Sequence, residues 1–336
     1  IPLGASFTVN KEKKGRITFN VVTNSVSSSE IRDYYYNNVE FDYSKYLDKS
    51  VYDYINEKGF YKKGYKEDIT DSVDEKEFYS SYKSSDYEKM SITTDIVLFS
   101  VSDIKKEAYR ELDKKVFSVL LVKRNTHPFI NRYCLPGGFV KDDETLDMAA
   151  DRVLTKETNL HNVFKEQLYT FSDMNRDPRT RVISTAYMSL IDRNKITDEL
   201  DENASWFNIH INEEKEIVNI VLDNGEEEIR FSLKKQLNDK TTNKYSYQII
   251  ENNNLAFDHP IIIMTGIDRM KNKVQDTDII FNMMPEYFTL GELQQIYEIL
   301  LGKKLLDPAF RRIIANKVEK TEKMKTGGGH RPSVLF

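Results

Sequence analysis

The sequence contains a single cysteine, Cys134, among its 336 residues, so it cannot form an internal disulfide bond. It also lacks any apolar run of the roughly 18 residues that a membrane-spanning helix requires. Residues 1–4 lack the basic segment followed by an apolar one that begins a secretory signal. We therefore expect a cytoplasmic protein with no membrane partner, in which Cys134 is a small buried residue rather than a nucleophile.

An excess of positive charge is also missing, because the net charge is −5. Nucleic-acid binding draws on Lys and Arg side chains that neutralise phosphates, so the sequence does not favour a protein that coats nucleic acid with its whole surface. One local exception exists, since residues 307–336 hold seven Lys or Arg against three Asp or Glu. Any contact with nucleic acid is expected in that segment.

What the sequence does have is length and a globular composition, with 39% hydrophobic and 31% charged residues. At roughly 150 residues per domain, this length predicts two or three domains. Residues 1–90 carry twelve of the twenty tyrosines, and residues 31–60 suggest a small helical module or a packing extension. We leave residues 1–90 as an unassigned Tyr-rich extension.

From residue 93 onward, apolar segments of β-strand type alternate with turn residues. Residues 95–101 and 116–122 predict two strands, joined by an insertion near residues 102–115. A second insertion, near residues 212–254, contains a predicted β-hairpin around Asn224-Gly225, because this pair accepts positive φ angles. Further strands are predicted at residues 164–171, 181–190 and 204–211.

A helix is predicted from about residue 144 to residue 158, with Asp142 or Asp143 as its cap. The segment follows the pattern Gly, five residues, Glu, seven residues, Arg-Glu-aliphatic-any-Glu-Glu-any-Gly-aliphatic, with six of its nine defining residues. It therefore resembles the Nudix box. The resemblance implies an α+β fold, a Nudix α/β/α sandwich with a mixed sheet, over about residues 91–275. The matching residues are Gly138, Glu144, Arg152, Leu154, Glu157 and Leu160.

Three positions depart from the Nudix box, because Val153 and Lys156 replace glutamates and Asn159 replaces a glycine. In Nudix hydrolases these glutamates help to hold a divalent metal ion against a diphosphate. A valine offers no ligand, and the ammonium group of Lys156 would repel the cation. Asn159 still tolerates the left-handed conformation of a helix C-cap. The departures predict weak or absent hydrolysis.

The carboxylates that remain, Glu144 and Glu157, are a poor cage for Mg2+, which prefers oxygen ligands in a near-octahedral array. If the protein is a hydrolase, the resemblance implies that Arg152 and Glu157 are catalytic, that Glu144 and Glu157 bind metal, and that Mg2+ is the cofactor. Ligand sensing alone would require no cofactor. Lys156 then either neutralises a bound diphosphate in place of the metal, or it reflects drift on a helix without catalytic demand.

Two further segments resemble Nudix proteins that handle ADP-ribose or related sugars. Residues 175–184 are rich in arginine, which suits phosphate recognition, although a solvated charged turn is the alternative. Residues 257–260 resemble the end of the Nudix fold, where His259 is either a ligand-binding residue or the start of a helix. The residues expected to bind a nucleotide-sugar or sugar are Gly137, Gly138, Lys156, Arg176 and Arg179.

Residues 276–336 contain two further predicted helices and end in a predicted turn and short strand. A capping box at residues 289–292 precedes a helix that ends at Gly302, and Asp307-Pro308 begins a second helix. The segment resembles the winged helix-turn-helix of Nudix-related transcriptional regulators. The resemblance implies that residues 329–336 form the returning strand of the wing and that the segment contacts double-stranded DNA. The expected DNA-binding residues are Arg311, Arg312, Lys317, His330 and Arg331, although a dimerisation platform with a solvated basic face is the alternative.

Three functions follow as hypotheses. The first is a ligand-sensing transcriptional regulator, in which a hydrolysis-deficient Nudix domain binds an ADP-ribose-like or sugar effector and changes the DNA affinity of a homodimer. The second is an active, Mg2+-dependent Nudix hydrolase of the ADP-ribose pyrophosphatase type. The third is a non-enzymatic interaction scaffold, suggested by the Tyr-rich extension. The degenerate Nudix box and the winged helix together favour the regulator.

Overall fold

The computed structural model of the chain describes residues 34, 42–43, 46–58, 89–104, 114–159, 161, 163–196, 200–239, 241, 244–325 and 332–336. The chain divides into two compact units, residues 1–88 and residues 89–336, and each is described by itself. In the first unit, helix α2 (Lys49–Lys58) packs Ile55 against the buried Leu47. This helix lies within the helical module suggested for residues 31–60. Within the described residues, no helix is long and apolar enough to span a membrane.

The second unit is built around one mixed β-sheet of ten strands. Eight strands follow the order β10-β9-β8-β7-β2-β1-β6-β5, while β3 pairs with β2 and β4 pairs with β1. β1 and β6 are parallel, and the other pairs are antiparallel. This mixed sheet confirms the α+β class. The elements are β1 (Ser91–Ile104), β2 (Lys114–Lys123), β3 (Tyr133–Cys134), β4 (Gly137–Phe139), β5 (Phe164–Phe171), β6 (Val182–Asp192), the 3-10 helix η3 (Arg193–Lys195), β7 (Ala204–Glu214), β8 (Ile217–Asp223), β9 (Glu228–Asp239) and β10 (Lys244–Asn252).

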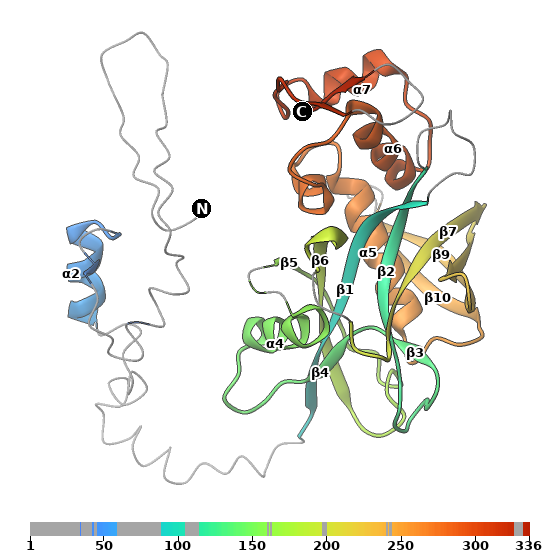
Figure 1. Cartoon of the computed structure of the whole chain (residues 1–336). Coiled ribbons are helices and arrows are strands. Elements are labelled where there is room, and N and C mark those ends of the chain that lie inside the picture. Colours follow the sequence, from blue (N-terminus) through green and yellow to red (C-terminus); the bar gives the residue numbers. More distant parts are fainter. Residues whose placement is uncertain are drawn as a thin grey trace. The chain divides into compact units, whose positions relative to one another are not determined.

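Strand β1 lies inside the sheet and is buried on both faces. Phe99 points to one face, where it shares a core with helix α5 (His259–Lys273). Leu98 points to the other face, where it shares a core with helix α4 (Leu146–Thr158). This alternation follows the two-residue period of a strand. The two helices cover opposite faces of the sheet, which gives the expected α/β/α layers (Figure 1).

Strands β7 to β10 form an antiparallel meander that extends the main sheet. The predicted hairpin around Asn224-Gly225 joins β8 and β9, with Gly225 at φ +87°. The prediction was incomplete, because β7 continues to Glu214 beside β8, and β10 pairs with β9. The charged residues 212–216 concealed these longer strands, since strand residues that face solvent are often charged.

Helix α4 begins later than predicted. Its cap is Thr145, whose hydroxyl oxygen accepts a hydrogen bond from the Met148 N–H at 3.2 Å, and neither Asp142 nor Asp143 caps it. The helix ends as predicted, because Asn159 adopts the left-handed conformation at φ +54°.

The winged helix lies beyond one end of β1 and β2 (Figure 1). The predicted capping box between Thr289 and Glu292 is present, and Gly302 ends that helix at φ +64°. The next helix is capped by Leu306, so Asp307 is its first residue and not its cap. The predicted returning strand of the wing pairs antiparallel with the strand before it. The elements are η4 (Ile279–Met283), α6 (Leu290–Leu301), α7 (Asp307–Ile314), β11 (Met324–Lys325) and β12 (Ser333–Val334).

The winged helix shares its apolar core with the sheet. Phe99 of β1 belongs to the same buried cluster as Leu293 of α6 and Phe310 of α7. A polar contact adds to this packing, because the side-chain oxygen of Gln295 in α6 accepts a hydrogen bond from the Lys115 N–H of β2 at 3.0 Å. The sheet and the winged helix therefore form one continuous core.

Tyr297, in α6, has a buried hydroxyl group without a hydrogen-bond partner among the described residues. Burial raises the pKa of this hydroxyl to about 12, and the ring packs edge-on against Phe310. An unpaired buried polar group costs about 1–3 kcal/mol. We therefore expect Tyr297→Phe to raise the free energy of unfolding by about 1 kcal/mol, measured by urea denaturation. A clear loss of stability would contradict this reading of the hydroxyl.

Candidate functional site

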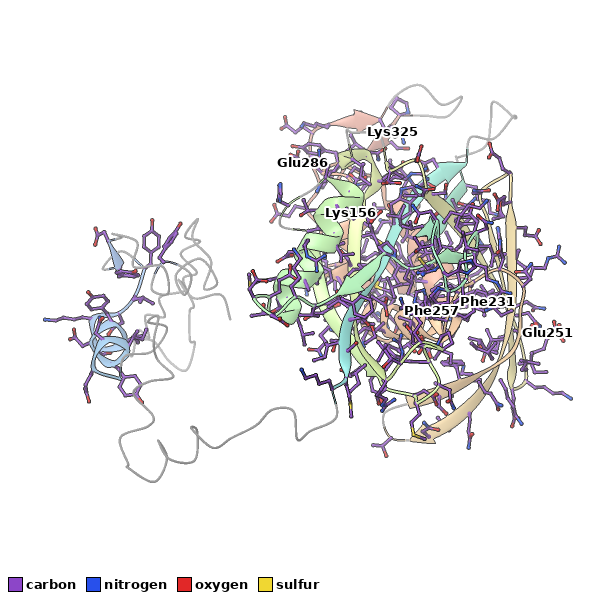
Figure 2. All side chains as sticks on the ribbon, turned by 90° about the horizontal axis from the view of Figure 1, so that it is seen from below. Lys156, Phe231, Glu251, Phe257, Glu286 and Lys325 are labelled. Carbon is purple, nitrogen blue, oxygen red and sulfur yellow. The ribbon has the colours of Figure 1, made fainter. Side chains whose placement is uncertain are left out.

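A cavity of about 310 Å³, called the cleft below, lies among β1, β4, α4 and the start of α5. Its wall also includes Asp95, Glu157 and His259. Figure 2 shows Lys156 on α4 and Phe257 in the segment before α5, and both line the cleft. The wall contains all five residues that the sequence suggests for ligand binding: Gly137, Gly138, Lys156, Arg176 and Arg179.

Gly137 occupies a place where no side chain fits. A Cβ atom there would lie 2.5 Å from the Asp95 carboxylate and 2.8 Å from the Thr94 carbonyl oxygen. Glycine is therefore required for β4 to pair closely with β1 at this point. Gly138 has more room, because its nearest neighbour would be an Arg152 nitrogen at 3.7 Å.

Glu144 and Arg152 form an ion pair between α4 and the turn before it. The Arg152 guanidinium group donates to both Glu144 oxygens, at 2.5 and 2.8 Å, and to the Phe139 carbonyl oxygen at 3.0 Å. The hydrogen bonds from Arg152 lower the pKa of Glu144 to about 2. The pair ties α4 to β4 and orients the glycine segment. Glu144 is thus committed to Arg152 and is not a free metal ligand.

Lys156 and Glu157 bring opposite charges to the cleft. Lys156 Nζ donates to Glu157 Oε1 at 2.9 Å, and this hydrogen bond raises the pKa of Lys156. Glu157 has a side chain that is only 5% exposed, and its other oxygen has no partner among the described residues. The Thr93 hydroxyl, in the wall of the same cavity, is also buried without a described partner. The cleft therefore offers a ligand two buried polar groups.

Arg176 is buried beside the cleft, with its side chain 4% exposed. Its guanidinium group donates to both Asp258 oxygens, at 3.0 and 2.7 Å, and to Asp95 at 3.3 Å. Burial opposes the positive charge, but the hydrogen bonds and attraction from these carboxylates outweigh it and raise the pKa of Arg176. Asp258 precedes α5 without making a cap hydrogen bond, because Arg176 occupies its carboxylate.

His259 connects this charge network to the glycine segment. Its Nδ1 atom accepts a hydrogen bond from the Leu135 N–H at 2.8 Å, so in the neutral ring the proton is on Nε2. Nε2 faces Asp95 Oδ1 at 3.7 Å. Burial lowers the pKa of His259, aided by Arg176 and Arg124 and opposed by the carboxylates of Asp95 and Asp258. The ring is therefore a neutral structural link.

We expect this buried histidine to make the protein less stable in mild acid. The unfolded chain binds a proton at His259 below pH of about 6.5, whereas the folded chain does not. The free energy of unfolding should therefore fall as the pH decreases from about 6.5 towards the lowered pKa, by up to about 1.4 kcal/mol per pH unit. His259→Asn keeps an acceptor for Leu135 and does not titrate, so it should lose this part of the slope. Parallel pH profiles for the two proteins would refute the assignment.

Arg179 carries a more accessible charge at the cleft. Its guanidinium group pairs with Asp177 at 2.8 Å and lies 5.5 Å from the centre of the Phe139 ring, while its side chain is 43% exposed. Asp177 is buried, and its pKa is lowered because hydrogen bonds from Arg179 outweigh the effect of burial. Arg179 is therefore held in place but still open to a ligand.

The winged helix presents a second candidate surface. Arg311 and Arg312 are exposed on α7, and neither forms an ion pair with a described residue. Lys317 differs from the expectation, because its ammonium group donates to the carbonyl oxygens of Gln275 and Thr277 and lies 3.3 Å from Asp278. These contacts give Lys317 a structural role at the entrance to the winged helix. The predicted residues His330 and Arg331 lie outside the described residues.

Two known domain families match successive parts of the chain. Residues 109–229 match the NUDIX domain, and residues 280–336 match the NrtR DNA-binding winged helix domain. The chain therefore contains a Nudix domain followed by an NrtR-type winged helix domain. Most of the wall of the cleft lies within the residues that match the NUDIX domain, and Arg311 and Arg312 lie within those that match the winged helix domain.

The chain is similar to a transcriptional repressor and to two proteins of solved structure. The chain is 29% identical over 263 residues to the ADPR responsive transcriptional repressor NtrR of Acinetobacter baylyi, which covers 76% of this chain and 85% of the repressor. It is 26% identical to Shewanella oneidensis NrtR solved in complex with a 27mer DNA, with a TM-score of 0.51 over 73% of this chain and 91% of that one. A MutT/nudix family protein from Enterococcus faecalis is 25% identical, with a TM-score of 0.57 over 86% and 99% of the two chains.

The Nudix helix of this chain does not fit a divalent metal ion. Val153 is buried in the apolar cluster that contains Leu98, Lys156 is cationic, and Glu144 is bound to Arg152. Among the described residues, no three His, Cys, Asp or Glu side chains lie close enough together to hold a metal ion. One buried carboxylate, Glu157, is too small a donor set for Mg2+. The weak metal assignment of Glu144 and Glu157 is therefore not supported.

Sequence reasoning missed the partners that hold this Nudix cleft together. Asp95 and Asp258 are far apart in the sequence, and their shared contact with Arg176 follows only from the fold. A usable signal was Asp95 itself, an ionisable residue at the start of an apolar strand. The expectation that Cys134 is buried is confirmed, and burial raises its pKa to about 11.

Proposed function

We propose that the protein is a transcriptional repressor whose Nudix cleft binds ADP-ribose without hydrolysing it and whose winged helix binds double-stranded DNA. The observation that carries this proposal is the Lys156–Glu157 pair, which puts an ammonium group where Nudix hydrolases have a metal-binding carboxylate. The relatives support the choice of ligand, because one of them is described as ADPR responsive.

Ligand binding would use the charges that line the cleft. Lys156 and Arg179 are the cations with exposed side chains, and both can donate to diphosphate oxygens. Glu157 Oε2 can accept a hydrogen bond from a ligand hydroxyl group, and the Thr93 hydroxyl can donate one to a phosphate oxygen. The ammonium group of Lys156 would neutralise phosphate charge but would not polarise the bond or activate water as a metal ion does. The cleft would therefore bind the diphosphate without hydrolysing it.

The DNA-binding half of the proposal depends on α7. Arg311 and Arg312 are exposed on the helix that corresponds to the recognition helix of a winged helix, where arginine can contact phosphates and guanine edges. A homodimer would place two such helices on one duplex, as symmetric half-sites require. ADP-ribose would regulate the protein if it bound the free and DNA-bound forms with different affinity.

The test is calorimetric titration of the full chain with ADP-ribose in EDTA, beside a turnover assay with Mg2+ or Mn2+. We expect binding without metal and no measurable hydrolysis. Lys156→Glu should weaken binding by at least about tenfold, because it removes one charged donor and adds repulsion, whereas Lys156→Arg keeps the charge and should retain most of the affinity.

Two outcomes would overturn the ligand-binding half of the proposal. Hydrolysis that requires metal would indicate the alternative function, an ADP-ribose pyrophosphatase of unusual metal site. Equal affinity for ADP-ribose in Lys156→Glu and the wild type would show that Lys156 is not part of the site.

The DNA-binding half of the proposal is tested by selection from a random pool of DNA duplexes. The protein should recover a preferred sequence, and ADP-ribose should release the protein from that DNA. Recovery of no preferred sequence would contradict this half of the proposal.

A further inference from the structure

A second cavity, of about 750 Å³, lies next to the cleft. Arg176 and Phe257 line both cavities, so they form a shared wall. The loop before β6 contributes residues to both sides of this wall. Asn175 and Pro178 line the second cavity, while Asp177 and Arg179 line the cleft. One bound molecule could therefore contact both cavities across this wall.

The cleft alone is small for a nucleoside diphosphate sugar. Pockets that enclose small-molecule ligands have volumes of about 300–1,000 Å³. The cleft, at about 310 Å³, is at the lower limit of this range, whereas ADP-ribose contains a base, two riboses and two phosphates. The cationic groups of Lys156 and Arg179 line the cleft, so the two phosphates of the ligand are expected to bind there. The rest of the ligand needs additional space, and the second cavity adjoins the cleft.

The wall of the second cavity contains two phenylalanines in an unusual backbone conformation. Phe129 and Phe257 have φ angles of +61° and +54°, in the left-handed region that bulky residues rarely adopt. Their rings meet edge to face, with centres 4.8 Å apart. The Arg124 guanidinium group lies 4.9 Å from the centre of the Phe257 ring and so supports it. Strain of this kind is concentrated at ligand-binding sites, where it holds groups in place.

Resting on the function proposed above, we infer that the second cavity binds the nucleobase of the ligand, with Phe129 and Phe257 as its aromatic wall. A planar base presents an apolar face to such rings and an edge of hydrogen-bonding groups. Asn175 and Gln248 line the same cavity and supply donors and acceptors for that edge. The site would therefore distinguish nucleotide-linked ribose from ribose phosphates that have no base.

Phe129→Gly is the decisive variant, because Phe129 lines only the second cavity and glycine accepts a positive φ. The ring is removed while the backbone strain is relieved, so the fold should survive. Asn131→Gly is the matched control, since Asn131 lies in the same loop at φ +66° but lines neither cavity. Calorimetry with ADP-ribose should show at least about tenfold weaker binding for Phe129→Gly and unchanged binding for Asn131→Gly.

Saturation-transfer NMR on bound ADP-ribose provides the second measurement. In the wild type the adenine protons H2 and H8 should receive strong transfer, and in Phe129→Gly this transfer should fall relative to the ribose protons. Wild-type binding that Phe129→Gly leaves unchanged would overturn the inference and leave the proposed function intact. A wild-type protein that does not bind ADP-ribose would instead overturn the proposed function.

Discussion

Arg176→Met is expected to lower the free energy of unfolding by about 3–5 kcal/mol, because it breaks a buried ion pair from one side. Methionine has a similar length, so the substitution leaves little new empty space. It does leave the carboxylates of Asp95 and Asp258 buried without the cation that both now contact. Urea denaturation of the two proteins at neutral pH measures the loss.

Arg230→Met provides the control, because Arg230 on β9 has an ion pair that is open to solvent on both sides. Arg230 pairs with Glu228, and their side chains are 71% and 42% exposed, whereas that of Arg176 is 4% exposed. An ion pair open to solvent contributes about 0–1 kcal/mol, so this variant should unfold nearly as the wild type does. Equal losses in the two variants would show that burial is not what makes Arg176 important.

Replacing Arg311 and Arg312 together by alanine is expected to reduce DNA affinity by at least about thirtyfold. Each arginine that binds a base edge contributes about 1–3 kcal/mol, and 1.4 kcal/mol corresponds to about tenfold in affinity. The dependence of affinity on salt should also become less steep, by about one unit for each phosphate that the variant no longer neutralises. Gel-shift titration of a selected duplex at several salt concentrations measures both effects.

A control with the same change in net charge comes from the β7–β10 meander. Lys215 and Lys234 are exposed there, and Lys215→Ala with Lys234→Ala also removes two positive charges. DNA affinity should change little in this variant, since these two charges lie outside the winged helix. If both double variants weakened binding alike, the effect would come from overall charge and α7 would have no special role.

Local patterns in the sequence predicted most elements of the Nudix fold and of the winged helix. The strands near residues 95–101 and 181–190 are apolar enough to be recognised, and the capping box at Thr289 and Glu292 marks its helix. The errors have two causes. Thr145 caps α4 although the two aspartates before it are also suitable cap residues, and the charged residues where β7 meets β8 resemble a loop.

The chemistry of the cleft was less predictable than its location. The resemblance to Nudix proteins pointed to Lys156, Arg176 and Arg179 as candidate ligand-binding residues, and all three line the cavity. Sequence could not reveal that Arg176 is buried and paired, because its partners are 81 and 82 residues away. Nor could it reveal that Lys317 bonds to backbone carbonyl oxygens, since a lysine after a basic helix looks the same whether it is free or engaged.

The uninterrupted core between the sheet and α7 leaves no joint, within the residues that the structure describes, at which the helix proposed to bind DNA could swing against the Nudix domain. Asp95 at the cleft and Asp103 near the winged helix lie on the same strand, eight residues or about 26 Å apart. In the homodimer proposed above, a ligand would therefore act by tilting whole subunits against each other. Each subunit would move as one rigid body, so that a small displacement at the cleft would produce a larger displacement of α7 relative to the DNA.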